Sequence, residues 1–310
     1  MTGASNENVP NLNPLDVQTF FADRLKVPDG TGLMECRYHY TTPDVLENFL
    51  VDEGDLLCTH CRAVNDSREF IVGAKVVIEY MKARQWSKNL IERVVNHVNG
   101  ATQFDMAMPW IFSLSLYNDS LFQWSNYTDR KEGGYAIGFS EELIEQLTIK
   151  RVVKANQNSK LPVSTFFFAC LYLGIDDVFA WLDEFFKEHI TPGIVYAPSI
   201  ENHLANEIVS IALMVAMFIK EKSFFIEGEW RLALVPNFDA AYDDVVSIGG
   251  RPRLRARIKD DIGLLRDAIK SVVVSPHGRR ETLYLNALNL KRRHKANFNV
   301  AFSSSSYRGL

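Results

Sequence analysis

Short strand-like segments lie on both sides of a block of helical patterns, and this arrangement most constrains the fold. Brief alternating or apolar runs predict strands, and apolar residues three or four apart predict helices. The expected strands are 37–41, 56–59, 110–116, 135–139, 149–154, 229–235, 245–248, 254–258, 272–275 and 299–302, and the central helices are 165–173, 175–189 and 202–222. We therefore expect an α+β fold. We expect residues 1–30 to form a polar extension with a short helix, and residues 31–310 to form one domain with a helical insertion at about 161–222.

Other helices are indicated by their start signals. Asp66 or Ser67 can cap a helix that runs to about Lys82, because a carboxylate or hydroxyl accepts the first exposed N–H groups. Thr42 followed by Pro43 is typical of another helix start. Further helices are predicted at 14–27, 86–98, 141–147 and 282–290.

The composition, 47% hydrophobic and 23% charged over 310 residues, is that of a globular chain and excludes a mostly disordered one. The longest apolar run, Ile208–Ile219, has 12 residues, fewer than the ~20 that span a bilayer. Residues 1–13 have neither a basic start nor an apolar run, so we expect no signal peptide. Four cysteines do not make a disulfide framework, and without an export signal we expect a cytoplasmic protein with reduced thiols. Because no apolar run is long enough to span a bilayer, we expect no membrane partner.

Charge is distributed unevenly along the chain. Residues 249–310 hold 14 Lys or Arg against 4 Asp or Glu, a net +10, and residues 1–248 hold 20 against 34, a net −14. Alternate positions on a strand share one face, and four such positions hold Arg251, Arg253, Arg255 and Arg257. A second basic cluster is 291–295. These clusters indicate either a contact with phosphate or nucleic acid, or a solvated surface that offsets the acidic part.

The common motifs of nucleotide, hydrolase and metal sites are absent from the sequence. It has no phosphate loop, no Gly-x-Gly-x-x-Gly, no Gly-x-Ser-x-Gly and no His-Glu-x-x-His. Cys58 and Cys61 have half of a zinc spacing, but no second pair completes it, so buried or surface thiols are favoured and no metal is expected.

Three polar constellations remain. The segment 38–41, Tyr-His-Tyr-Thr, has aromatic rings that could line a pocket for a flat ligand, although a lone strand histidine is more often structural. Glu227 and Glu229 are two residues apart, so on a strand they would share one face, where like charges cost free energy unless a cation faces them or one is exposed. Trp124 and Tyr127 share one face of a helical turn.

The order of several short motifs resembles a widespread bacterial family of domains of unknown function, often described as abortive-infection-like. The similarity covers about residues 33–310, and the motifs are Tyr38–Thr42, Asn65–Glu69, Phe112–Ser115, Asn118–Ser120 with Trp124 and Tyr127, Gly134–Phe139, Glu229–Arg231, Val272–Pro276 and Ser305–Arg308. This family in turn distantly resembles the ADP-ribosyltransferase superfamily. The resemblance implies an ADP-ribosyltransferase-like split β-sheet with a central helical insertion and NAD in its cleft.

The resemblance also implies roles for individual residues. His39 matches the position that holds the ribose and the nicotinamide amide, and Glu229 matches the carboxylate that anchors the ribose and stabilises the cationic transition state. Between these two in the sequence, the superfamily has a Tyr or Ser that supports the nicotinamide ring. That position matches Tyr127, Tyr135 or Ser113, and we favour Tyr127. Glu227 matches a residue that activates the acceptor in some members.

Further residues are expected to contact NAD, namely Tyr38, Tyr40, Thr41, Asn65, Ser113, Trp124, Tyr135 and Arg231. Arg231, Arg37 or Arg68 could hold the diphosphate, since a guanidinium fits phosphate oxygens. An ion pair of Arg231 with Asp66 or Glu69 is equally compatible with the sequence.

Three functions are consistent with the sequence. The first is an NAD-consuming ADP-ribosyltransferase, a toxin or phage-defence effector that modifies nucleic acid or protein. A fixed carboxylate and aromatic walls suit its chemistry, which needs no metal. The second is a nucleotide-binding sensor without catalysis, indicated by the missing Ser-Thr-Ser strand. The third is a nucleic-acid-binding or nuclease module that uses the basic C-terminal third.

Overall fold

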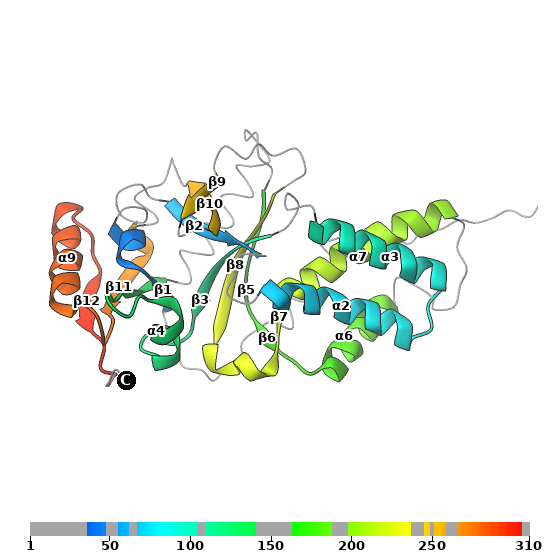
Figure 1. Ribbon diagram of the computed structural model, residues 1–310, viewed down its shortest axis with the longest axis horizontal. Helices are drawn as coiled ribbons and strands as arrows, with labels where there is room; N and C mark the ends of the chain where they lie inside the picture. Colours follow the sequence, from blue (N-terminus) through cyan, green and yellow to red (C-terminus); the bar gives the residue numbers. More distant parts are fainter. Residues whose placement is uncertain are drawn as a thin grey trace, which may run out of the picture. The chain divides into compact units, whose positions relative to one another are not determined.

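The computed structural model describes residues 36–47, 55–61, 67–103, 109–140, 163–187, 198–236, 245–248, 251–257 and 266–305 (Figure 1). The chain divides into two compact units. Unit 1 contains the helices α2 (Ser67–Ala83), α3 (Lys88–Gln103), α6 (Ile175–Lys187) and α7 (Pro198–Phe218), with the short strands β6 (Leu171–Tyr172) and β7 (Ile219–Lys220). Unit 2 contains the large sheet and the remaining helices.

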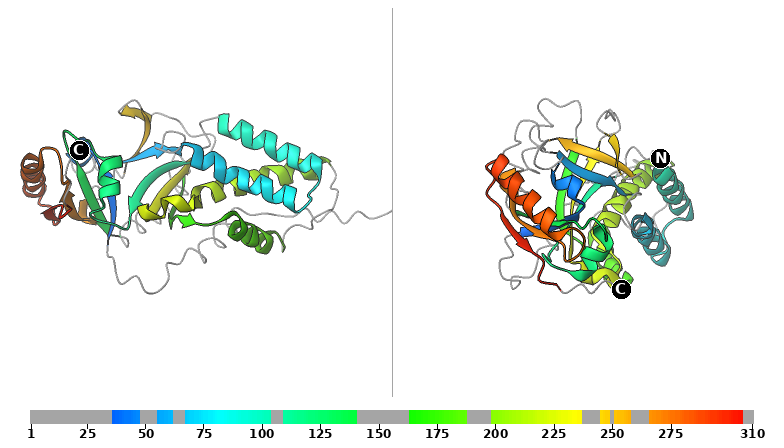
Figure 2. Two further views of the ribbon diagram at one scale, coloured as in Figure 1. Left: turned by 60° about the horizontal axis from the view of Figure 1, so that its bottom comes forward. Right: turned by 60° about the vertical axis from the view of Figure 1, so that its left-hand side comes forward.

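In unit 1, α2 and α3 pack on the apolar helix α7 (Figure 2). Gly73 permits the close approach of α2, because a Cβ at that position would lie 2.5 Å from the Cα of Ala216. Val77 and Met81 of α2 and Val215 of α7 are fully buried. The bounds of α2, α3, α6 and α7 confirm, within a few residues, the helices expected at 66–82, 86–98, 175–189 and 202–222. None of the described helices has the length and apolar character needed to cross a bilayer.

Unit 2 is built on a ten-stranded, mostly antiparallel sheet. Its strands are β1 (Cys36–Thr41), β2 (Asp55–His60), β3 (Trp110–Ser115), β4 (Tyr135–Ser140), β5 (Val163–Ala169), β8 (Glu229–Pro236), β9 (Val245–Ile248), β10 (Arg251–Arg257), β11 (Ile269–Val274) and β12 (Asn299–Phe302). The main order is β12-β11-β4-β1-β3-β2-β10-β9, and β8 joins β3 to β5. The α+β class is confirmed by this mixture of a mostly antiparallel sheet and helices.

The sheet forks at β3. β8 pairs with β3 along its whole length, from Trp110 to Ser115, and so occupies one edge. The other edge is shared: β2 pairs at Trp110 and Ile111, and β1 pairs at Ser115. The sheet therefore has two limbs, β1-β4-β11-β12 and β2-β10-β9, that diverge along the middle of β3.

Different elements pack on the two faces of the limb β1-β4-β11-β12. The principal core includes Tyr135, Ile137 and Phe139 of β4, and Leu283 of the helix α9 (Arg280–Arg293) packs against it. On the opposite face, Ala136 of β4 contacts Tyr40 and Trp124, the latter on the helix α4 (Leu121–Tyr127). We call the face that carries Ala136 the α4 face. Figure 2 shows α9 running beside β12.

One expected helix is wrong. Residues 165–173 were predicted as a helix, but β5 occupies Val163–Ala169 and pairs with β8 at seven positions. Three consecutive phenylalanines, 166–168, fit apolar surfaces on both faces of a sheet strand: Phe167 packs against the principal core and Phe168 is buried. The expected insertion at 161–222 contributes α6 and α7 to unit 1, where they pack with α2 and α3. The predictions at 14–27, 141–147 and 149–154 lie outside the described residues.

Candidate functional site

A row of polar residues crosses the sheet of unit 2. Tyr38 is paired with Ser115, and Ser115 with Glu229, so residues of three strands lie side by side. The next row on β3 and β8 pairs Ser113 with Arg231. Residues two apart on a strand share a face, and Tyr38 packs against the Tyr40–Trp124 cluster. The row therefore lies on the α4 face, and we take it as the candidate site.

Glu229 and Arg231 form a buried, two-pronged ion pair. Arg231 Nε donates to Glu229 Oε1 at 2.9 Å, and Nη2 donates to Oε2 at 3.1 Å. The side chains are only 5% and 8% exposed. This geometry gives the carboxylate two charge-assisted hydrogen bonds and lets the two charges be buried together. The interaction of Arg231 with Glu229 was not among the ion pairs expected from the sequence.

The segment that leads into Glu229 is fixed by its backbone. The carbonyl of Glu227 accepts hydrogen bonds from Ser115 Oγ at 2.7 Å and from Gln123 Nε2 at 3.1 Å. The expectation that Glu227 shares a strand face with Glu229 is wrong, because Glu227 ends the 3₁₀ helix η4 (Lys222–Glu227) and β8 begins only at Glu229; Glu227 is buried. Gly228 has φ +50°, and a Cβ there would lie 2.9 Å from the Tyr117 ring. The two carboxylate-bearing residues are thus positioned by a glycine turn that links η4 to β8.

An aromatic cluster lies beside the polar row. The rings of Tyr40 and Trp124 meet edge to face at 4.6 Å, and Tyr38 and Tyr127 pack against this pair. The Tyr40 hydroxyl donates to the carbonyl of Tyr117 at 2.9 Å and accepts from the amide of Ser120 at 2.9 Å. Burial raises the pKa of both Tyr38 and Tyr40, so both phenols remain neutral at physiological pH.

His39 lies on the face opposite to Glu229. Its ring stacks on Phe112 with centroids 4.2 Å apart, and its Nδ1 lies 2.8 Å from the carbonyl oxygen of Ser113. Phe112 belongs to the principal core, three residues before Ser115 on β3, and therefore on the other face. His39 sits at the point where β1 separates from β3. The structure does not bring it to the polar row.

Three other expected contact residues, Tyr135, Thr41 and Arg37, also lie on the side of the principal core. Tyr135 is fully buried, and its hydroxyl donates to the carbonyl of Leu283 at 2.9 Å. Thr41, the neighbour of Tyr135 across β1 and β4, is buried as well. On the same face, the Arg37 guanidinium lies 4.2 Å from the centre of the Trp230 ring. These residues support the fold of the sheet and are separated from the candidate site.

Several expected residues have side chains outside the described part of the chain. Asn65 lies outside it altogether, and Arg68 is described only as a backbone position in α2. For the four arginines of β10, the structure gives the backbone register: Arg253, Arg255 and Arg257 pair with Thr59, Leu57 and Asp55 of β2, and Arg251 pairs with Ile248 of β9. The expected strand and its alternating positions are confirmed, and the phosphate contact stays a prediction.

The sequence reasoning missed a carboxylate at the start of α4. The carboxylate of Asp119 accepts five hydrogen bonds, one from Trp124 Nε1 at 2.7 Å and four from the segment Ser303–Ser305. The available signals were the Asn-Asp-Ser sequence at 118–120 and the run of serines at 303–306. Burial opposes ionisation of Asp119, but the hydrogen bonds outweigh it and lower its pKa below the ordinary value.

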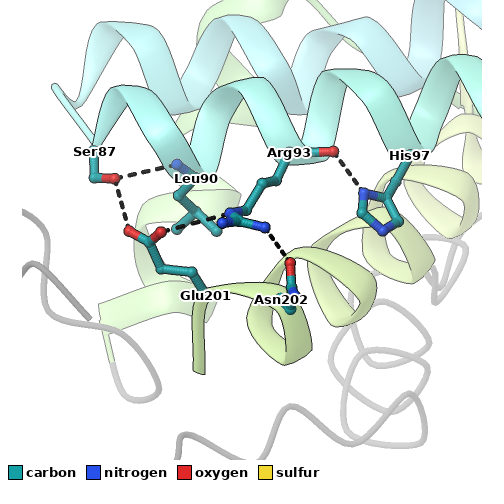
Figure 3. Close-up of polar contacts among 6 residues, drawn as sticks. All are labelled: Ser87, Leu90, Arg93, His97, Glu201 and Asn202. Carbon is teal, nitrogen blue, oxygen red and sulfur yellow. Dashed lines mark hydrogen bonds and ion pairs between the residues drawn. The ribbon is translucent and has the colours of Figure 1, made fainter. Parts of the chain in front are cut away.

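Unit 1 has its own buried carboxylate, shown in Figure 3. Glu201 of α7 accepts a hydrogen bond from Ser87 Oγ at 3.2 Å and lies 3.6 Å from Arg93 Nε. Ser87 Oγ also accepts from the amide of Leu90 at 3.1 Å, and so caps α3. This network fastens the start of α3 to the start of α7.

All four cysteines are buried. Within the described ranges, no group of three or more His, Cys, Asp or Glu residues is arranged to hold a metal ion. No match to this chain was found among family models, curated proteins or solved structures.

Proposed function

We propose that unit 2 binds NAD on the α4 face and transfers its ADP-ribosyl group to a macromolecule. The observation that carries this proposal is the Glu229–Arg231 pair, buried beside a wall of tyrosine and tryptophan rings. A fixed carboxylate stabilises positive charge that develops on a sugar. The Tyr38 and Tyr127 rings offer flat apolar surfaces against which the nicotinamide can stack.

The reaction assigns a separate task to each polar residue. The bond between C1′ and the pyridinium nitrogen breaks, and its electron pair leaves with nicotinamide, which becomes neutral. Glu229 stabilises the cationic ribose, and a nucleophile of the acceptor bonds to C1′ and gives its proton to Glu227. Arg231 holds the Glu229 carboxylate in place with two hydrogen bonds, and its positive charge suits the anionic diphosphate. His39 acts as a positioning residue, because its contact with the Ser113 carbonyl holds β3 in place.

A second function is favoured by the same ion pair. Arg231 engages both oxygens of the Glu229 carboxylate, an arrangement that suits a binding site without catalysis. In that case the chain is a nucleotide sensor, and NAD binds without release of nicotinamide.

The test uses NAD labelled in the adenylate part. Wild-type protein and the Glu229→Gln variant are incubated with a cell lysate and with its nucleic-acid fraction, and transferred label and released nicotinamide are measured. Glu281→Gln, in the first turn of α9, is the matched control for loss of one carboxylate. We expect transfer by wild type and by the control, and a loss of at least about 100-fold in Glu229→Gln.

The other outcomes separate the alternatives. Transfer that survives Glu229→Gln contradicts the role of Glu229. Binding of NAD by calorimetry without nicotinamide release favours the sensor. No binding of NAD, together with affinity for nucleic acid that falls steeply with salt, favours the third function, a module that uses the basic C-terminal third.

A further inference from the structure

The segment Ser303–Ser305 forms a cradle for an anion. Two consecutive backbone amides, of Ser304 and Ser305, point at Asp119 Oδ2 from 2.7 and 3.1 Å. The hydroxyls of Ser303 and Ser304 donate to the two carboxylate oxygens at 2.5 and 2.8 Å. Successive N–H groups that converge in this way make a concave anion site, and the carboxylate of this chain's own Asp119 occupies it.

The cradle is anchored to the sheet at its other end. The amide of Ser303 donates to the carbonyl of Val274, at the end of β11, at 2.8 Å. The hydroxyl of Ser305 donates to the backbone carbonyl of Asp119 at 3.3 Å. The segment therefore runs from the edge of the sheet to the start of α4, and the Asp119 carboxylate joins the two.

Asp119 also connects this segment to the aromatic cluster. Its Oδ1 accepts from the indole of Trp124, which is fully buried against Tyr40. The residue after Asp119, Ser120, donates its amide to the Tyr40 hydroxyl. The Asp119 carboxylate therefore contacts the Trp124 ring directly, and it reaches the Tyr40 hydroxyl through the amide of the next residue, Ser120.

We propose that Ser303–Ser305 is a strap, closed over the start of α4 by the Asp119 carboxylate, and that closure holds the aromatic cluster in its ligand-binding arrangement. The second half of this proposal rests on the proposed function of the α4 face. The strap is sensitive to charge. Ser304 is exposed and its hydroxyl donates to Asp119 Oδ2. A negative charge placed on the side chain at position 304 therefore repels the Asp119 carboxylate and opens the strap.

The strap is tested by hydrogen exchange at the amides of Ser304 and Ser305, in wild type, Asp119→Asn and Ser304→Asp. Both variants are expected to exchange at least about tenfold faster at these amides, the factor that corresponds to loss of one charge-assisted hydrogen bond. Asp129→Ala is the matched control, because Asp129 also accepts two backbone amides, of Lys131 and Glu132, but does not contact the strap.

A second experiment asks whether the cradle recognises an anion. Asp119→Ala vacates it, and formate or acetate at tens of millimolar is expected to slow exchange of the two amides again. Neither anion should change exchange in wild type. Exchange that is unaltered in Asp119→Asn, or absence of rescue in a folded Asp119→Ala protein, overturns the strap.

Binding of NAD is measured on the same proteins. Weaker binding in Asp119→Asn and Ser304→Asp, but not in Asp129→Ala, supports coupling to the aromatic cluster, whereas equal binding in all four overturns that coupling. If wild type itself does not bind NAD, the proposed function fails, and the exchange and rescue measurements still decide the strap.

Discussion

At the scale of single residues, Gly138 sets how Tyr38 lies on the sheet. A Cβ at position 138 would be 2.3 Å from Ser271 Oγ and 2.7 Å from Tyr38 Cε1. Any side chain there must displace the ring. Tyr38 is paired with both Gly138 and Ser115, so its place in the polar row depends on this glycine.

Replacement of Gly138 by alanine is therefore expected to destabilise the protein by about 1–3 kcal/mol, the usual cost of overpacking. Urea denaturation measures the loss. The double variant Gly138→Ala/Ser271→Gly removes the closest clash and should recover part of it. An unchanged urea midpoint in Gly138→Ala would show that Tyr38 and Ser271 can shift to accommodate the methyl group without loss of stability.

His277 gives stability a dependence on pH. Burial is the main cause that lowers its pKa below the ordinary value of 6.5, and nearby Arg130 acts in the same direction, while Asp129 opposes it. Because the folded pKa lies below the unfolded one, the unfolded chain binds the proton more readily. The stabilising contribution is complete above about pH 6.5 and decreases as the pH falls towards the folded pKa.

We expect the free energy of unfolding to fall as the pH is lowered below about 6.5, and to fall less in His277→Gln. Urea titrations at several pH values provide the comparison. Parallel pH profiles for the two proteins would exclude His277 as the cause.

At the scale of elements, the helix pair α3–α7 depends on one buried carboxylate. Glu201 is 4% exposed in its side chain and contacts both Ser87 and Arg93 (Figure 3). Glu201→Ala leaves the Ser87 hydroxyl and the Arg93 guanidinium without this acceptor, and we expect a loss of about 1–3 kcal/mol.

The control for this change is Glu79→Ala in the same unit. Glu79 pairs with Lys82 at 2.8 Å, but both side chains are more than half exposed, so solvent screens the pair. A loss below about 0.5 kcal/mol is expected for the control. Equal losses in the two variants, measured by thermal unfolding, would contradict a special role of Glu201.

Local patterns predicted most elements of this fold. The capping signal at 66–67 precedes α2, and the alternating apolar residues of 135–139 form β4. The pattern failed at β5, because a run of apolar residues is compatible with a helix and with a strand buried on both faces. Only pairing with β8, more than sixty residues later, distinguishes the two.

The candidate site was predictable only in part. Glu229, Arg231, Tyr38 and Tyr127 were expected from the sequence, but strand register decides that the first three occupy adjacent rows. His39 and Tyr135 have suitable chemistry and face the principal core instead. The Asp119 cradle joins residues about 185 positions apart, a separation that no local motif encodes.

At the scale of the whole molecule, the chain passes back and forth between its two units. Unit 1 takes α2 and α3 from one part of the sequence and α6 and α7 from another, with strands of unit 2 between them. Each unit has its own buried apolar residues, so each is expected to respond separately to a mutation within it.

Hydrogen exchange under native conditions tests this expectation on the intact protein. Glu201→Ala should accelerate exchange in α3 and α7, and Gly138→Ala should accelerate it in β1, β4 and β11. Acceleration of both sets of amides by either variant would indicate one cooperative unit.

The fork at β3 has a consequence for folding during synthesis. The strands β1 to β4 leave the ribosome first, but β3, β4 and β2 have partners in β8, β11 and β10, which come from the last third of the chain. Unpaired strand edges invite association with other chains, and contacts between distant residues form slowly. A nascent chain that stalls before residue 229 leaves all of these edges unpaired at the same time, and we expect it to need chaperones that shield unfinished sheets.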